Sequence, residues 1–201
     1  GVLFALIAGG FSLVGVSLVA YLMWTPAFMV RRHGWDIGTV GLVYGSILIV
    51  GCTSGILIGS AWAERLLARG QRDAFLRVGL VGALTSLPFA IAAPFAPTGE
   101  WAMACLAAMA LFYGLTQGMP AAALQAIAPN RVRARTMALF LLTANIVSFT
   151  IGPTGAALIS DYVLRDPTQI GVAIAMLCAV VVPLGALAIG LARGRYVAAT
   201  S

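Results

Sequence analysis

The chain alternates between long uncharged stretches and short clusters of charge. The shortest of its six uncharged stretches has 22 residues, and the six cover residues 1–30, 37–63, 78–99, 101–130, 136–160 and 167–192. A helix needs about 20 apolar residues to cross the hydrocarbon of a bilayer, whereas helices of soluble proteins carry charge on their outer face. Backbone polar groups in lipid must be satisfied within the segment. The pattern therefore predicts an all-α fold, a polytopic membrane helical bundle with six transmembrane helices.

Charge clusters and prolines give the expected ends and bends of these helices. We expect helices at about 2–31, 36–67, 73–95, 100–127 and 133–163, and a sixth that follows the loop at 165–169 and ends near 193. Asp36 is the expected N-cap of the second helix. Pro26, Pro120 and Pro153 predict bends in the first, fourth and fifth helices, because proline has no N–H to donate. No linker divides the chain, so residues 1–201 are expected to form one six-helix domain.

A short pattern recurs in the second and fifth helices. Gly55 precedes Glu64 by nine residues, and Gly152 precedes Asp161 by nine. The two acids end on opposite sides of the membrane, as related units of opposite orientation require. The pattern predicts a 3+3 inverted repeat of three-helix units.

Glycines recur every four residues in the second helix. Gly51, Gly55 and Gly59 form one stripe, with Gly41 and Gly45 before them. Small residues at this spacing let a neighbouring helix approach closely. Two interpretations stay open, ordinary close packing and a packing seam that shifts between two states.

Composition and charge agree with a membrane protein and set its orientation. Hydrophobic residues make up 61% of the chain and charged residues 9%, and all twelve basic residues are arginine. The arginines lie at span ends and form no continuous basic face, which argues against a nucleic-acid partner. Nine fall on one side of the membrane and three on the other, so the positive-inside rule places both chain ends in the cytoplasm. The nine are Arg65, Arg69, Arg72, Arg77, Arg131, Arg133, Arg135, Arg193 and Arg195.

Polar side chains concentrate in four of the six helices. The sixth helix has no hydroxyl or amide from Gly171 to Ala192, and the third has only Thr85 and Ser86. Polar groups within spans need a partner or water. Hydrogen bonding between helices is one explanation, and a water-filled cavity accounts better for the uneven distribution. The residues expected to line that cavity are Tyr21, Trp24, Tyr44, Tyr113, Gln117 and Asn145.

The same inventory argues against catalytic chemistry. No Asp or Glu lies within a span, and the three cysteines lie far apart. His33, the one histidine, is expected to be solvated in an outer loop. We therefore expect no catalytic residue, no metal site and no cofactor, and a membrane-embedded enzyme is a remote alternative. Any ion coupling must come from outside this chain.

The segment after the second helix, SAWAERLLARGQR, resembles the signature loop of the major facilitator superfamily. That loop reads Gly-x-Leu-Ala-Asp-Arg followed by Gly and basic residues; here Ser60, Trp62 and Glu64 replace its Gly, Leu and Asp, and the later part carries an insertion. The stretches PNRVRAR, NIVSFTIGPTGAALISD and WTPAFMVRRHGW are most similar to bacterial spinster-like members.

The resemblance implies that the chain is the C-terminal six-helix half of such a transporter, with the N-terminal half absent. It implies secondary active transport of a small, possibly amphipathic substrate across the bacterial inner membrane by alternating access, in partnership with the lipid bilayer and the other half. In the family this loop latches one access state, a gating role that falls here to Glu64, Arg65 and Arg69. The alternative is a self-contained six-helix protein that transports as a homodimer. Because the sequence starts with Gly and enters a span directly, we expect a fragment.

Overall fold

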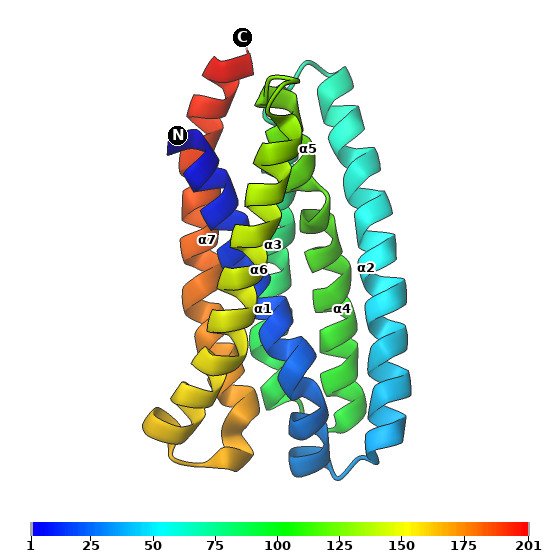
Figure 1. Cartoon of the computed structure of the whole chain (residues 1–201). Coiled ribbons are helices and arrows are strands. Elements are labelled where there is room, and N and C mark those ends of the chain that lie inside the picture. The colour runs from blue at the N-terminus through cyan, green and yellow to red at the C-terminus, as the bar shows by residue number, and fades with distance from the viewer. Residues whose placement is uncertain (1, 201) are drawn as a thin grey trace.

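The computed structural model describes residues 2–200, apart from the side chains of residues 167, 199 and 200. Within that part of the chain, six helical segments are long and apolar enough to cross a membrane. Seven α-helices build them (Figure 1), because the fourth segment is divided: α1 Val2–His33, α2 Ile37–Ala68, α3 Ala74–Ala92, α4 Gly99–Gln117, α5 Met119–Ile127, α6 Arg133–Leu158 and α7 Ile170–Thr200. Short helices extend two of them or precede another: η1 Ala93–Phe95, the π-helical η2 Ile159–Leu164 and η3 Pro167–Gln169.

Side-chain caps define two of the helix starts at the end of the bundle opposite the chain ends (Figure 1). Asp36 caps α2 as predicted, because its carboxylate accepts from the backbone N–H groups of Gly38 at 2.9 Å and Thr39 at 3.1 Å. Thr98 caps α4 in the same way by accepting from the Trp101 N–H at 3.5 Å. Such caps satisfy backbone donors that have no partner within the helix.

The last helix differs from its predicted end. The sequence suggested an end near Arg193, where the first charge of the final cluster appears. Instead α7 continues to Thr200, because the Arg193 guanidinium is paired with Asp73 and the Tyr196 side chain is 1% exposed. The Arg193–Asp73 pair and the buried Tyr196 side chain thus hold the last part of α7 against the bundle. The charge pattern had placed this part of the chain in the aqueous phase.

The helices are arranged as two related groups of three. Helix α1 packs mainly on α6 and α7, α4 packs mainly on α2 and α3, and α3 meets α7 at the back of the bundle. Exchanging α1, α2 and α3 with α4, α6 and α7 reproduces these pairings. The predicted glycines occupy matching places, since Gly55 of α2 lies against α4 and Gly152 of α6 lies against α1. This arrangement agrees with a 3+3 inverted repeat.

The glycine stripe of α2 forms part of a close helix contact. A Cβ on Gly51 would lie 3.0 Å from the Ala110 Cβ of α4, and one on Gly59 would lie 3.0 Å from the Leu115 Cα. Gly41 and Gly45 have no atom in the corresponding space within 4 Å. Close packing is thus confirmed for the three glycines nearest the α2–α3 loop.

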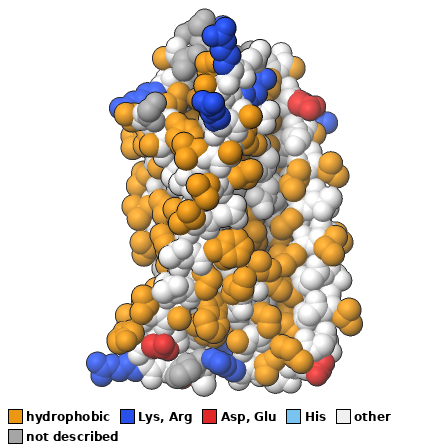
Figure 2. Space-filling view, in the orientation of Figure 1, with side chains coloured by type: hydrophobic (Ala, Val, Ile, Leu, Met, Phe, Trp, Pro, Cys, Tyr) orange, Lys and Arg blue, Asp and Glu red, His pale blue; other side chains and the backbone are white. Residues whose placement is uncertain are grey.

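Charged and apolar surface divide the molecule into bands. Figure 2 shows arginine side chains at the two ends and hydrophobic side chains over the belt between them. On α7 a stripe of exposed apolar residues at helical spacing includes Val180, Leu184, Leu187 and Leu191. Both chain ends lie at the same end of the bundle (Figure 1), as six crossings require.

Candidate functional site

A cavity of about 330 Å³ lies between α1, the α4–α5 break and α6. Its size is at the lower end of the range for small-molecule sites, which is roughly 300–1,000 Å³. Most of the wall is aromatic or aliphatic. The polar side chains that line it are Tyr113, Thr116, Gln117, Asn145 and Ser148.

The break between α4 and α5 lies at the wall of this cavity. Helix α4 ends at Gln117, and the Gly118 N–H turns back to the Thr116 carbonyl. Pro120, in the first turn of α5, has no N–H to continue the ladder. The predicted bend near Pro120 is therefore a true interruption. Interrupted helices within a membrane occur where the backbone is enclosed by protein or lines a cavity.

Three residues from three helices meet at the inner wall. The Ser148 hydroxyl of α6 donates to the Ser12 carbonyl of α1 at 3.1 Å. A Cβ on Gly15 of α1 would lie 2.6 Å from the Ser148 Oγ and 3.6 Å from the Tyr113 hydroxyl of α4. The missing side chain of Gly15 therefore leaves the space in which these two hydroxyls lie near each other.

Two amides lie at the open side of the cavity. Gln117 and Asn145 are both exposed, although each belongs to a span that carries no charge near it. The Asn145 Nδ2 donates to the Leu141 carbonyl of its own helix at 2.7 Å. An amide turned toward hydrocarbon would lose hydrogen bonds that water supplies, so this side of the bundle is suited to water or to another protein surface.

The structure brings together three of the six predicted lining residues. Tyr113, Gln117 and Asn145 line the cavity, whereas Tyr21, Trp24 and Tyr44 lie outside it. Tyr21 is fully buried and its hydroxyl donates to the Ala90 carbonyl of α3. The half-buried Trp24 donates from Nε1 to the Pro153 carbonyl of α6 at 3.1 Å. Tyr44 is buried, with Thr25 of α1 beside its hydroxyl.

The geometry of α1 explains why Tyr21 and Trp24 lie outside the cavity. Consecutive residues of an α-helix are about 100° apart around its axis. Leu22 lines the cavity and Tyr21, its neighbour, therefore points well away from it. The true cavity face of α1 is apolar and has helical spacing, but it is not distinguished from its surroundings because α1 is hydrophobic on all sides. It consists of Phe11, Gly15, Leu18, Val19 and Leu22.

Sequence reasoning also missed residues next to those it found. Ser148 and Phe149 follow Asn145 by three and four positions and lie on the same side of α6. Phe140 lies five positions before Asn145 and completes the wall from α6. The i, i+3 and i+4 spacing from Asn145 is the signal that identifies Ser148 and Phe149.

The predicted gating residues form an exposed group at the end of α2. Glu64 and Arg65 lie in its last turns, and Arg69 is its C-cap. All three side chains are exposed. Within residues 2–200, the two ion pairs found are both made by Asp73, so Glu64 is not paired with either arginine.

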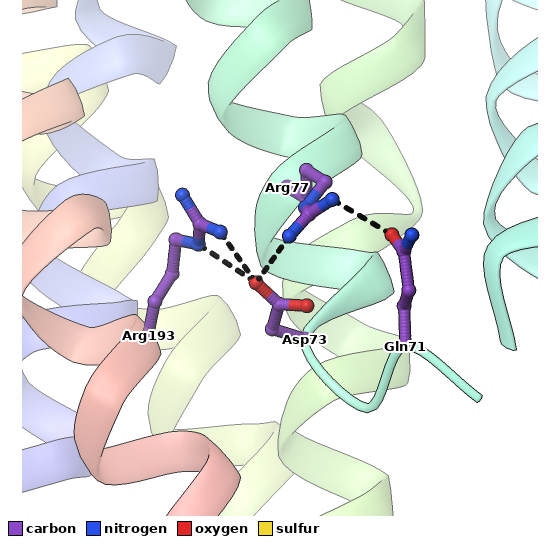
Figure 3. Close-up of polar contacts among 4 residues, drawn as sticks. All are labelled: Gln71, Asp73, Arg77 and Arg193. Atoms are coloured by element: carbon purple, nitrogen blue, oxygen red, sulfur yellow. Dashed lines mark hydrogen bonds and ion pairs between the residues drawn. The ribbon is translucent and has the colours of Figure 1, made fainter.

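The charge cluster that the structure does contain surrounds Asp73, next to α3 (Figure 3). Its Oδ2 accepts from the Arg193 Nε at 2.9 Å and Nη2 at 2.6 Å. The Arg77 Nη2 lies 3.5 Å from the same oxygen. Burial acts to raise the pKa of the Asp73 carboxyl, but the hydrogen bonds and charges of Arg193 and Arg77 outweigh it and lower that pKa. Asp73 is therefore a carboxylate.

His33 does not lie free in solvent as the sequence suggested. It is partly buried, and its ring meets the Phe28 ring edge-on at a centroid distance of 5.5 Å. Its Nε2 is enclosed without a hydrogen-bond partner. Among the described residues, no three His, Cys, Asp or Glu side chains lie together in a group that could hold a metal ion.

Known proteins resemble this chain in sequence and in fold. The sequence model of the Major Facilitator Superfamily matches residues 1–153. An MFS-type efflux pump of Mycolicibacterium smegmatis is 29% identical over 198 residues, which are 96% of this chain and 45% of that protein. Two crystal structures of a bacterial homologue of the human lysosomal transporter Spinster, both inward-facing, share the fold at 18% identity. The unoccupied form has a TM-score of 0.67 with 98% of this chain and 47% of that one covered, and the occupied form 0.68 with 100% and 49%.

The chain spans about half the length of the curated relative and of the solved structures that it matches. The family match extends from α1 through most of α6, and so includes the helices that build the cavity. The six membrane-spanning segments and their packing accord with it. The chain is an integral membrane protein and belongs to the major facilitator superfamily of membrane transporters.

Proposed function

We propose that this chain is one six-helix half of a secondary active transporter that moves a small amphipathic molecule by alternating access. The observation that carries the proposal is the cavity at the interrupted α4–α5 segment, with Gln117 and Asn145 on its open side. In transporters built from repeats, the binding site lies near the middle of the membrane between the moving units. Tyr113, Gln117 and Asn145 are the proposed substrate contacts of this half.

The other half is the proposed partner of the exposed faces of α2 and α6. In their most hydropathic stretches only 11% of α2 and 17% of α6 is buried, against 56% of α1. Lipid alone is a poor neighbour for exposed amides such as Asn145. The relatives have about as much chain again as this one, which is the length of a second six-helix half.

We infer that the arginine-rich end faces the cytoplasm of a bacterial cell and that the membrane is the inner one. The α2–α3 and α5–α6 loops and both chain ends lie at that end (Figure 1). Short arginine-rich loops are retained on the cytoplasmic side. Under this orientation Glu64, Arg65 and Arg69 lie where a cytoplasmic latch against the other half would form.

The cavity chemistry favours an amphipathic substrate. Its lining residues provide aromatic and aliphatic surface, three hydroxyls and two amides, without a charged side chain. Such a wall binds an apolar body and orients it with neutral hydrogen bonds. The curated relative is an efflux pump, so ethidium, a flat amphipathic cation, is a suitable first probe.

Reading the coding sequence upstream of Gly1 tests the proposed half-transporter arrangement. Six further apolar spans, encoded by about as many codons again, would support it. A start codon within a few residues of Gly1 would contradict it and leave a homodimer as the transporting unit. Cross-linking of Asn145→Cys to its own copy would then identify the dimer axis.

Ethidium efflux from cells that express the complete gene tests the transport activity itself. Cells carrying the wild-type gene should lose preloaded ethidium faster than cells with an empty vector, and Asn145→Leu should remove most of the difference. Leu187→Ala, on the lipid-facing stripe of α7, is the matched control and should behave as wild type. Equal rates for wild type and Asn145→Leu would contradict the assignment of Asn145 to the substrate path.

A further inference from the structure

The Asp73 cluster, consisting of Gln71, Asp73, Arg77 and Arg193, joins parts of the chain that are distant in sequence (Figure 3). Asp73 lies directly before α3, and Arg193 lies 120 positions later on α7. The Arg193 Nε and Nη2 both donate hydrogen bonds to the Asp73 Oδ2, at 2.9 and 2.6 Å. The Asp73 side chain is 11% exposed and that of Arg193 33%, so this contact is better shielded from water than a surface ion pair.

The cluster extends from α7 to the loop between α2 and α3. The Arg77 Nη1 donates to the Gln71 Oε1 at 2.8 Å, and the Gln71 N–H donates to the Leu66 carbonyl at 3.0 Å. Gly70 turns the chain with φ +79°, a conformation that glycine adopts without strain. A continuous set of polar contacts therefore links α7 to the last turn of α2.

The end of α2 is also where the exposed charges lie. Arg69 is the C-cap of α2 and Glu64 lies five residues before it. Among the described residues, neither side chain forms an ion pair with the Asp73 cluster. Two charge groups therefore lie at one end of the bundle. One is satisfied within this half, and the other is open to a partner.

We propose that Asp73 is a positioning residue that holds the α2–α3 loop against α7, so that Glu64, Arg65 and Arg69 are presented to the other half. A latch must open in each transport cycle, whereas the contact between Asp73 and Arg193 stays closed throughout the cycle. The consequence for transport rests on the proposed function, while the holding of the loop does not.

The distance between the loop and α7 tests this directly. Spin labels are placed at Ala68→Cys and Leu191→Cys, both exposed positions, in the complete gene product with its native cysteines replaced. We expect a narrow distance distribution for the otherwise unchanged protein and a broad one for Asp73→Asn. Asp73→Glu keeps the charge and should restore much of the narrow distribution. Asp161→Asn makes the same chemical change at an exposed acid of the opposite end and should have no effect.

Ethidium transport by the same variants tests the consequence. Asp73→Asn should lower the maximal rate several-fold and leave KM unchanged, because no residue of the loop lines the cavity. Asp73→Glu should recover most of the rate. An unchanged distance distribution in Asp73→Asn overturns the proposal, as does a broadened distribution with an unchanged maximal rate. If the wild-type protein moves no ethidium, the transport assignment fails for that probe, and the distance distribution still decides whether Asp73 holds the loop.

Discussion

Gly55 of α2 and Gly114 of α4 lie in backbone contact, since a Cβ on Gly55 would come within 2.7 Å of the Gly114 Cα. The matching glycine of the other repeat, Gly152, would place a Cβ 3.0 Å from the Val16 carbonyl oxygen of α1. In both units a glycine lets the flanking helix approach the central one. The two contacts hold α2 against α4 and α6 against α1.

Gly55→Ala should destabilise the protein through this contact. The added methyl meets backbone on α4, which cannot move as a flexible side chain does, and overpacking of this kind costs about 1–3 kcal/mol. Thermal unfolding in detergent measures the loss. Gly41→Ala is the control on the same helix, because nothing lies within 4 Å of its added methyl. Equal melting temperatures for the two variants would contradict the close packing of α2 on α4.

Gly15→Ala should impair the cavity more than the fold. Its methyl would lie 2.6 Å from the Ser148 Oγ, and a serine side chain can rotate away into the cavity. We expect slower ethidium efflux with a melting temperature close to that of wild type. Gly9→Ala, two turns earlier with open space around the new methyl, should leave efflux unchanged. Efflux that is equally fast in both variants would count against the inner wall described here.

Two tyrosine substitutions separate the core from the cavity. Tyr21→Phe removes the buried hydrogen bond to the Ala90 carbonyl and should cost about 0.5–1.5 kcal/mol of stability with KM for ethidium unchanged. Tyr113→Phe removes a hydroxyl from the cavity wall and should raise KM. Unfolding and transport are measured on both variants. A raised KM in Tyr21→Phe would place its hydroxyl in the substrate path instead.

The contribution of Asp73 to stability should depend on pH. Arg193 and Arg77 hold the pKa of the Asp73 carboxyl below its ordinary value of 3.8. A carboxyl with a lowered pKa stabilises the folded state above its ordinary pKa, and that contribution is lost as pH falls through the lowered value. The melting temperature of wild type should therefore exceed that of Asp73→Asn by a constant amount at neutral pH, and the gap should close below about pH 4. A gap that persists at lower pH would contradict the ionic origin of the contact.

The sequence allowed the spans to be predicted because charge is excluded from them. Five of the six expected segments agree with the observed helices to within a few residues, and the interruption near Pro120 follows from proline chemistry. The predicted end of α7 was wrong because, in the sequence, Arg193 resembles any other arginine at a span border. Only the fold shows that its partner, Asp73, lies 120 positions away.

Three of the six residues that were expected to line the cavity do line it. Gln117 lies one turn after Tyr113, so a polar face of α4 was visible as a pattern, and Asn145 is an amide in an uncharged span. The face of α1 could not be chosen in this way, because apolar residues surround Tyr21 on every side of the helix. Its orientation depends on packing against α6 and α7, which a nearly uniform hydrophobic stretch does not encode locally.

Two-sided labelling of Asn145→Cys tests the central claim of alternating access around this cavity most directly. The complete gene product, free of its native cysteines, is treated with a membrane-impermeant maleimide in right-side-out and in inside-out vesicles. Leu187→Cys, exposed on the lipid-facing stripe of α7, is the control and should stay unlabelled in both. We predict that Asn145→Cys reacts from both sides, because the cavity opens to each in turn. Labelling from neither side would show that Asn145 never meets water, and labelling from one side only would show that the cavity does not open to both. Either result would contradict the account.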